Sequence, residues 1–208
     1  MSKRWRSERG KDYYYRLSKK EGYRSRAAYK LIQISKKYRL LKAGDHVVDF
    51  GAAPGGWMQV ARKIVGDKGY VLGIDPTQIE KFPWHNVEVK IGNVKDYSDM
   101  IHKIKLPKKK VDVVLSDVSP NISGIRDIDH VKQIELAEDS LKAASFILRP
   151  GGNFVVKAFQ GDLLKPFVNN VKKFFKYVRL IKPAASKSKS SEIYVLGLGF
   201  NPPTNEVT

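Results

Sequence analysis

The chain has 208 residues, enough for one domain with a hydrophobic core, and 42% of them are hydrophobic, which indicates a globular protein. It contains no cysteine, so disulfide bonds, thiolate metal sites and a cysteine nucleophile are excluded. No apolar run approaches the roughly 20 residues of a membrane span and the N-terminus is polar, so we expect a cytoplasmic protein that does not enter membranes.

Two basic segments carry most of the formal net charge of +18. Residues 1–30 hold 11 Lys and Arg against 3 acids, and residues 165–190 hold 8 Lys and Arg with no acid. Tyrosines are interleaved with the N-terminal cations, and flat rings can stack on unpaired bases. Neither segment shows the wide apolar face of a membrane-surface helix. The distribution therefore favours a nucleic acid partner over a generic solubilising charge.

The chain begins with residues 1–22, which lack apolar periodicity and are expected to form a mobile basic arm. A single domain is expected over residues 23–202, with a short tail over 203–208. Ser25 is the expected N-cap of a first helix, because apolar residues follow it at helical spacing as far as Tyr38.

Strands and helices then alternate along the chain. The predicted strands are 46–50, 70–75, 87–91, 111–117, 152–158, 177–182 and 193–200. The predicted helices are 57–66, 95–105, 128–148 and 162–176. This alternation predicts an α/β fold with a seven-stranded, mostly parallel sheet and helices on both faces. No helix fits between the last two strands, so we expect them to pair antiparallel, with a mobile Lys- and Ser-rich loop over 182–191.

The most informative segment is VVDFGAAPGGW over residues 47–57, an apolar run that ends in an acid and a glycine-rich turn. In open α/β sheets a nucleotide-like ligand binds at such a junction. The GxGxxG spacing of dinucleotide sites is absent, and Pro54 removes a backbone donor that a pyrophosphate would need. We therefore expect an adenosine ligand without phosphates. The candidate residues in this turn are Asp49, Gly51, Gly55 and Trp57.

Polar residues also follow the next two predicted strands. Asp75 ends the second strand, where an acid can accept hydrogen bonds from both ribose hydroxyls of an adenosine. Taken without the glycine turn, an acid at this position can also be a turn residue or a helix N-cap. Asn93 follows the third strand and is placed to meet the adenine ring, which by itself is a weak indication.

Three charged residues lie at the ends of the later strands. Asp117 follows the fourth strand, Lys157 closes the apolar fifth strand, and Glu192 begins the last one. A lysine at the end of an apolar strand is costly to bury unless an anion or a reaction keeps it there. The alternatives are that Lys157 is only a structural partner of Asp117 and that Glu192 is a rim charge.

With these residues in place, the chain resembles the FtsJ/RrmJ family of ribose 2′-O-methyltransferases, in its archaeal type. The resemblance covers roughly residues 22–200. It rests on SRAAYKL (25–31), VVDFGAAPGGW (47–57), SDVSPN (116–121), VVKAFQG (155–161) and SEIYV (191–195). It implies a Rossmann-like fold, S-adenosyl-L-methionine as cofactor, no metal, and 2′-O-methylation of a ribose, expected to be a uridine, in 23S-type large-subunit ribosomal RNA.

The resemblance also implies residue roles. The family's catalytic tetrad, Lys-Asp-Lys-Glu, falls on Lys30, Asp117, Lys157 and Glu192. Lys157 is then our candidate general base, while Lys30 and Glu192 orient the ribose and its phosphate. The family's cofactor contacts fall on Gly55, Trp57, Asp75, Asn93 and Asp117. The family usually has aspartate at the position of Asn93, and asparagine keeps an acceptor but adds donors.

Other functions remain open at this point. A transfer RNA ribose methyltransferase would share the tetrad, and a non-catalytic RNA-binding ribosome-assembly factor could use the same fold. A nicotinamide-dependent dehydrogenase would share the sheet, but the turn lacks GxGxxG and the charge would be unexplained. We expect a monomer whose partner is ribosomal RNA or the large ribosomal subunit.

Overall fold

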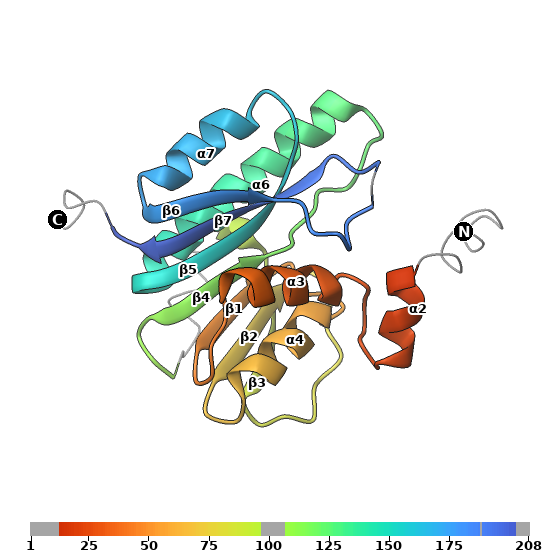
Figure 1. The fold of residues 1–208 in the computed structure, drawn as a ribbon, viewed down its shortest axis with the longest axis vertical. Coiled ribbons are helices and arrows are strands. Elements are labelled where there is room, and N and C mark those ends of the chain that lie inside the picture. Colours follow the sequence, from red (N-terminus) through yellow and green to blue (C-terminus); the bar gives the residue numbers. More distant parts are fainter. Residues whose placement is uncertain (1–12, 97–106, 188, 203–208) are drawn as a thin grey trace.

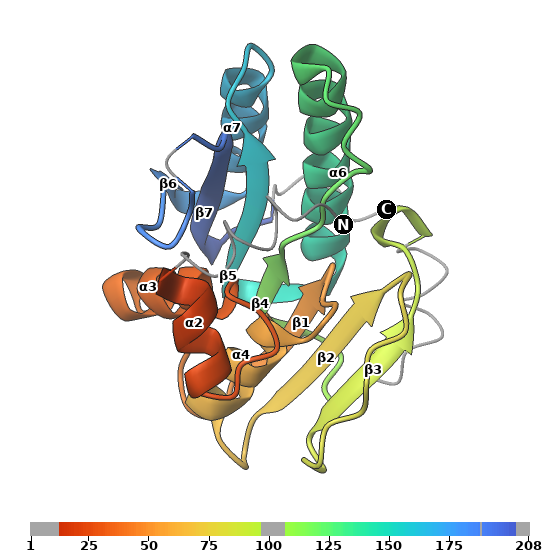
Figure 2. The same ribbon diagram turned by 90° about the vertical axis from the view of Figure 1, so that its right-hand side faces the viewer.

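A computed structural model describes residues 13–96, 107–187 and 189–202, which build one sheet between two layers of helices (Figures 1 and 2). The seven strands have the order β3-β2-β1-β4-β5-β7-β6. They are β1 (His46–Phe50), β2 (Tyr70–Asp75), β3 (Val87–Ile91), β4 (Val111–Ser116), β5 (Leu148–Phe159), β6 (Phe175–Ile181) and β7 (Glu192–Phe200). Only β7 is antiparallel to its neighbours, β5 and β6, so the predicted sheet is confirmed.

Helices cover both faces of this sheet. The helices α3 (Ala28–Tyr38) and α4 (Gly56–Val65) pack on one face, and α6 (Arg126–Ile147) and α7 (Leu164–Lys172) pack on the other (Figure 2). A short 3₁₀ turn, η1 (Val94–Asp96), follows β3. The central strands β1 and β2 are buried along their whole length. Their near-continuous apolar sequence is what a parallel strand covered on both faces requires.

The N-terminal segment differs from its prediction, because residues Tyr13–Lys20 form a helix, α2. Its cationic composition hides a small apolar face: Tyr14 packs on Tyr29 with ring centroids 5.4 Å apart, and Gln33 donates a hydrogen bond to the Tyr14 hydroxyl at 3.1 Å. The helix is amphipathic, and the contacts of its apolar face with α3 and the core hold this short helix. Residues 1–12 lie outside the described residues.

The start of α3 is also different from the prediction. Ala27, not Ser25, occupies the N-cap position, and it makes no side-chain capping bond. Ser25 lies instead against the first turn of α4, where its hydroxyl fills the space that a side chain at Gly56 would need. The neighbouring Arg24 donates its backbone N–H to the side-chain oxygen of Gln59 at 2.7 Å. Contacts with α4 therefore fix the segment that leads into α3. A capping rule based on neighbouring residues does not include these contacts.

Most remaining boundaries agree with the sequence to within a few residues. The strand β5 begins earlier than predicted, at Leu148, and α7 ends earlier, at Lys172. Most of the helix predicted over 95–105 lies outside the described residues. Among the residues that are described, no helix is long and apolar enough to cross a membrane.

The topology brings the functional candidates to one edge of the sheet. Strand β1 pairs in parallel with β2 on one side and β4 on the other, so the connections that leave it go in opposite directions. Ligands of open α/β sheets bind outside the carboxyl ends of the strands at this switch point.

Candidate active site

A cavity of about 670 Å³ lies at this switch point, outside the carboxyl ends of β1, β2 and β4. Four of the predicted cofactor residues line it, namely Gly51, Asp75, Asn93 and Asp117. The remaining three predicted residues, Asp49, Gly55 and Trp57, are not among its lining residues. The cavity therefore brings together the ends of four strands that are distant in the sequence.

Gly51 gives this cavity its shape. Its φ is 71°, and a Cβ placed on it would lie 2.7 Å from the backbone of Val118, so the two loops can approach only if this residue is glycine. Asp75 is fixed beside it: one carboxylate oxygen accepts the N–H of Ala53 at 3.0 Å and the other accepts that of Thr77 at 2.8 Å. Each oxygen keeps a further lone pair for the hydroxyl groups of a ligand.

Gly55 and Trp57 support the glycine turn from within the protein. Gly55 precedes α4 with a φ of 108°, and a Cβ there would lie 2.6 Å from the Phe82 ring. Trp57 is only 3% exposed, and its indole N–H donates to the backbone oxygen of Ala27 at 2.8 Å. In this structure Trp57 thus links the turn to the start of α3.

Asp49 is buried beneath the cavity. Neither of its carboxyl oxygens meets a hydrogen-bond partner within the described part of the chain. Burial, together with the nearby charges of Asp117 and Asp75, raises the pKa of Asp49 well above its usual value. Asp49 is therefore a neutral carboxylic acid over a pH range in which an exposed aspartate is ionised.

The four predicted tetrad residues lie together beside the cavity. The Lys157 amine donates to the backbone oxygen of Asp117 at 2.7 Å and lies 3.3 Å from the Asp117 carboxylate. The Lys30 amine donates to the Glu192 carboxylate at 2.6 Å, and both of these side chains are 13% exposed. Helix α3, strands β5 and β7, and the residue that follows β4 therefore each supply one member.

Tyr194 joins the two ion pairs, although it was not among the residues predicted from the sequence. Its hydroxyl donates to the Asp117 carboxylate at 2.8 Å and accepts from the Lys30 amine at 3.2 Å. Tyr194 lies directly opposite Lys157 in the β5–β7 pairing. It also follows Glu192 by two residues, which places both side chains on one face of β7. That period-2 spacing is the signal that could have identified it.

The electrostatics of this cluster depend on Asp117 and Tyr194. Burial acts to raise the pKa of Asp117, but Lys157, Lys30 and the hydrogen bond from Tyr194 outweigh it and hold that pKa below its usual value. Burial and the neighbouring carboxylates of Asp117 and Glu192 raise the pKa of Tyr194 well above its usual value. The cluster thus combines a neutral phenol that donates with an ionised carboxylate that accepts.

The loop before β7 closes one side of the cluster. Ser186 donates to the second oxygen of Glu192 at 2.9 Å. The backbone of the fully buried Ala185 accepts a hydrogen bond from Arg26 and donates to the side-chain oxygen of Gln33 at 3.1 Å. The loop that the sequence suggested to be mobile is thus anchored to α3 and its preceding turn at this point.

Asp117 belongs to both the cavity and the cluster, so a ligand in the cavity would lie next to Lys157. The described residues contain no group of three or more His, Cys, Asp and Glu side chains placed to hold a metal ion. The sheet order, the switch-point cavity and this Lys-Asp-Lys-Glu cluster define a Rossmann-like methyltransferase that uses S-adenosylmethionine.

Comparison with known proteins identifies the family. Residues 23–200 match the profile of the FtsJ-like methyltransferases, and the chain belongs to this family. It is 50% identical over 198 residues to "Ribosomal RNA large subunit methyltransferase E" of Methanocaldococcus jannaschii, a match that covers 93% of this chain and 80% of that protein. Identity to the protein of the same name from Methanothermobacter thermautotrophicus is 45% over 203 residues, covering 96% and 95% of the two chains.

Solved structures agree with this assignment. A crystal structure described as a ribosomal RNA methyltransferase of Plasmodium falciparum superposes with a TM-score of 0.78 at 31% identity, covering 87% of this chain and all of the other. Fibrillarin of Aeropyrum pernix with bound S-adenosyl-L-methionine gives a TM-score of 0.58 at 17% identity, covering 85% and 75% of the two chains. The second likeness concerns the fold alone.

Proposed function

We propose that this protein transfers a methyl group to the 2′-oxygen of a ribose, at a uridine, in large-subunit ribosomal RNA of the 23S type. The observation that carries the proposal is the placement of the Lys157 amine beside Asp117, where the cofactor cavity meets the buried cluster. The names of the curated relatives support ribosomal RNA as the substrate.

The residues of the cavity fit the cofactor. Asp75 offers carboxylate oxygens to ribose hydroxyls, Asn93 offers an amide to the adenine, and the glycine backbone at Gly51 leaves room for close approach. When bound, S-adenosylmethionine supplies an electrophilic methyl group on a sulfonium. No part of this cavity needs to bind a phosphate, which agrees with the absence of the GxGxxG spacing.

The chain must then make a ribose hydroxyl nucleophilic. In the proposed step the Lys157 amine would accept the proton of the 2′-hydroxyl as the ribose oxygen takes up the methyl group that the cofactor would supply. Asp117 pairs with the Lys157 amine at the end of β5, and Tyr194 donates a hydrogen bond to Asp117. Together these contacts fix where the amine lies. Lys30 and Glu192, paired at 2.6 Å, are assigned to orienting the ribose and the neighbouring phosphate.

The general-base role is tested by replacing Lys157 with residues that cannot accept a proton. Lys157→Arg keeps the positive charge and hydrogen-bond donors, but an arginine is not deprotonated in proteins. We expect Lys157→Arg and Lys157→Ala both to lower kcat by about 10² to 10⁴-fold, with unchanged affinity for S-adenosylmethionine. The exposed Lys142→Arg on α6 is the matched control and should keep the wild-type rate. Near wild-type methylation by Lys157→Arg would mean that the charge, not proton transfer, is what matters.

The substrate is tested by labelled methyl transfer to free ribosomal RNA, assembled large subunits and transfer RNA in parallel, with the modified nucleotide mapped. Label at a uridine 2′-oxygen in large-subunit RNA is the expected result. Label in transfer RNA alone would assign the protein to transfer RNA instead. Cofactor binding without transfer to any of the three would contradict an enzymatic role on these RNAs.

A further inference from the structure

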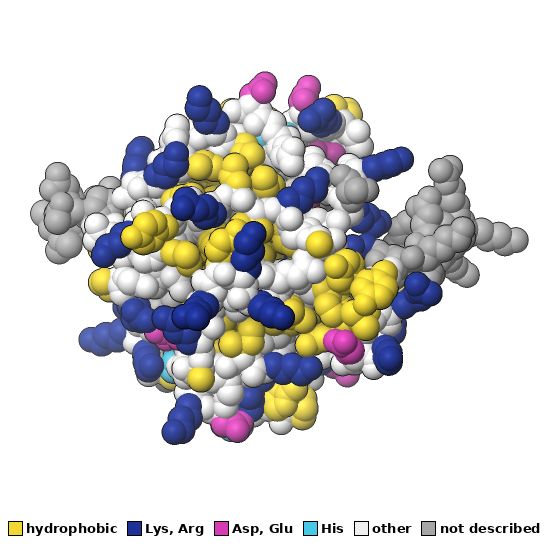
Figure 3. All heavy atoms as spheres, viewed as in Figure 1, with side chains coloured by type: hydrophobic (Ala, Val, Ile, Leu, Met, Phe, Trp, Pro, Cys, Tyr) yellow, Lys and Arg dark blue, Asp and Glu magenta, His cyan; other side chains and the backbone are white. Residues whose placement is uncertain are grey.

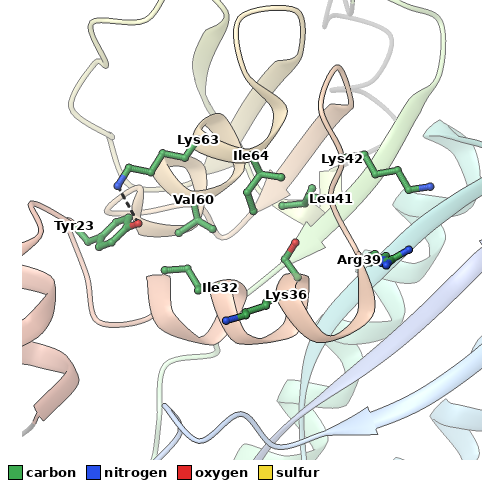
Figure 4. A pocket seen from close by; sticks show the side chains of 10 residues that line it. Tyr23, Ile32, Lys36, Arg39, Leu41, Lys42, Val60, Lys63 and Ile64 are labelled. Carbon is green, nitrogen blue, oxygen red and sulfur yellow. Dashed lines mark hydrogen bonds between the residues drawn. The ribbon is translucent and has the colours of Figure 1, made fainter.

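We propose that a groove between α3 and α4 binds an unpaired nucleotide of the RNA substrate, outside the catalytic cluster. This inference rests on the proposed function in that it takes RNA as the partner. The groove has a volume of about 610 Å³ and none of the proposed catalytic or cofactor residues lines it (Figure 4). It is lined by Tyr23, Ile32, Ser35, Lys36, Arg39, Leu41, Lys42, Val60, Lys63 and Ile64.

The interior of the groove is apolar. Ile32 of α3 and Val60 of α4 point toward one another across it, and Ile64 and Leu41 continue the same surface (Figure 4). Val60 and Leu41 are buried in the core beneath, so this floor is rigid, whereas Ile32 and Ile64 are only partly covered. A planar base can bury its faces against such a surface, which inorganic phosphate cannot do.

Four cations surround this apolar interior, namely Lys36, Arg39, Lys42 and Lys63, and all four are exposed. No acid lines the groove, and none of the four forms an ion pair with another described residue. The nearby Asp45 directs its carboxylate at the backbone N–H of Lys42, at 2.8 Å. Like charges gathered around one groove repel each other and attract an anion.

Lys63 illustrates how the rim is arranged. Its amine lies 4.6 Å from the centre of the Tyr23 ring and donates to the Tyr23 hydroxyl at 3.1 Å (Figure 4). The aromatic ring holds this cation at the edge of the groove without neutralising it. A positive rim around an apolar floor matches a nucleotide within an RNA strand, where a base with apolar faces lies between two phosphates.

The position of the groove on α3 links it to the reaction. Lys30 on this helix belongs to the catalytic cluster. Ile32, Ser35 and Lys36 lie on another face of α3 and line the groove together with Arg39, which follows the last residue of the helix. Lys36 lies six residues after Lys30, which is about 9 Å along the helix axis and about 240° around it, so the groove and Lys30 lie on different sides of α3. The same side of the molecule carries many Lys and Arg side chains between apolar patches (Figure 3). A strand of RNA that reaches Lys157 would therefore cross the solvent-facing side of α3, at Gln33 and Lys37, to enter the groove.

The charge of the groove is tested with the double variant Lys36→Ala/Arg39→Ala. The control double variant, Lys90→Ala/Lys142→Ala, removes two exposed lysines from β3 and from α6 on the opposite face. Affinity for single-stranded RNA is measured by fluorescence anisotropy over a range of KCl concentrations. Each lost phosphate contact lowers the salt slope by about 0.7, so the groove variant should lose about 1.4 and the control nothing. In methylation assays the groove variant should raise KM for RNA and leave kcat unchanged.

The apolar floor is tested separately with Ile64→Ala, which keeps every charge. We expect weaker RNA binding with an unaltered salt slope, and crosslinking of 4-thiouridine RNA to peptides from 32–42 or 60–64. If Ile64→Ala bound RNA with wild-type affinity, no base would contact the apolar floor, and the proposal would be overturned. The proposal would also be overturned if the Lys36→Ala/Arg39→Ala variant bound RNA as tightly as the control variant does. The same holds if this variant lost affinity for polyglutamate, used as a second polyanion, while keeping its affinity for RNA.

These results separate the groove from the proposed function. Wild-type protein that methylates RNA while the groove variants behave as the control overturns the groove alone. Wild-type protein that binds RNA through the groove, binds S-adenosylmethionine and transfers no methyl group supports the groove and overturns the proposed function.

Discussion

Tyr194→Phe tests whether the cluster works as one connected network. The substitution removes one hydroxyl and leaves the ring, which is fully buried and packs beside Trp57 with ring centroids 5.7 Å apart. The hydroxyl donates to Asp117 at 2.8 Å and accepts from Lys30 at 3.2 Å. Lys30 keeps its shorter bond to Glu192 after the change, so the main loss is the hydrogen bond to Asp117.

The size of the effect follows from that bond. A hydrogen bond to a charged group contributes about 1.5–3 kcal/mol, and we expect the free energy of unfolding to fall by about this amount. If the same bond holds Asp117 and Lys157 in their reactive arrangement, kcat should fall at least ~10-fold, because about 1.4 kcal/mol corresponds to a factor of ten. The affinity for S-adenosylmethionine should change little, since Tyr194 does not line the cavity.

The pH dependence of stability gives a second readout. Asp117 has a lowered pKa in the folded protein, so it stabilises the fold above its unfolded pKa and loses this contribution as pH falls. Tyr194→Phe removes one of the causes of the lowering, so the acid-induced loss should be smaller in the variant. Denaturant unfolding between about pH 2 and 7 and steady-state kinetics measure both effects, with the exposed Tyr177→Phe as the control. Wild-type stability and kcat in Tyr194→Phe would refute the network.

Two further predictions concern the turn beneath the cofactor. In the folded protein the buried Asp49 keeps its proton, whereas in the unfolded chain it releases the proton above about pH 4. The free energy of unfolding of the wild type therefore falls as pH rises above this value. In Asp49→Asn, which has no proton to release, this free energy should fall less. Gly51→Ala should weaken S-adenosylmethionine binding and stability, because a φ of 71° costs about 1–2 kcal/mol for alanine and the added methyl would lie 2.7 Å from Val118.

Each of these predictions has a direct control. For Asp49→Asn, denaturant unfolding of variant and wild type at several pH values is compared, and parallel curves would contradict a neutral Asp49. For Gly51→Ala, calorimetric titration with the cofactor is compared with Gly66→Ala, which has a φ of 69° and open space around it. Equal cofactor affinity in the two glycine variants would contradict the close approach at Gly51, because Gly66 does not line the cavity. An equal loss of stability in both would assign that loss to backbone conformation.

Local patterns in the sequence predicted the strands and the glycine turn, and the family resemblance added the four tetrad residues. Parallel strands covered on both faces must be apolar, so β1, β2 and β4 were recognisable from short stretches alone. Their carboxyl ends meet at one edge of the sheet, which is why Asp75, Asp117 and Lys157 could be assigned to one site before any distance was known.

What depends on contacts between distant segments was decided by the tertiary structure. Helix α2 is stabilised by the contacts of Tyr14 with Tyr29 and Gln33. Ser25 packs against α4 and does not cap α3 as expected. Tyr194 became part of the site only when β7 paired antiparallel with β5 and placed it opposite Lys157.

The same distinction applies to the charge. Sequence alone determined that this protein is strongly basic and that an adenosine-type ligand belongs at the turn after β1. It could not determine that cations from α3, α4 and the turn at Lys42 surround one apolar groove. Hydrophobic periodicity and strand-end chemistry are local properties of the chain, whereas a groove or a hydrogen-bond network exists only when separate elements pack together.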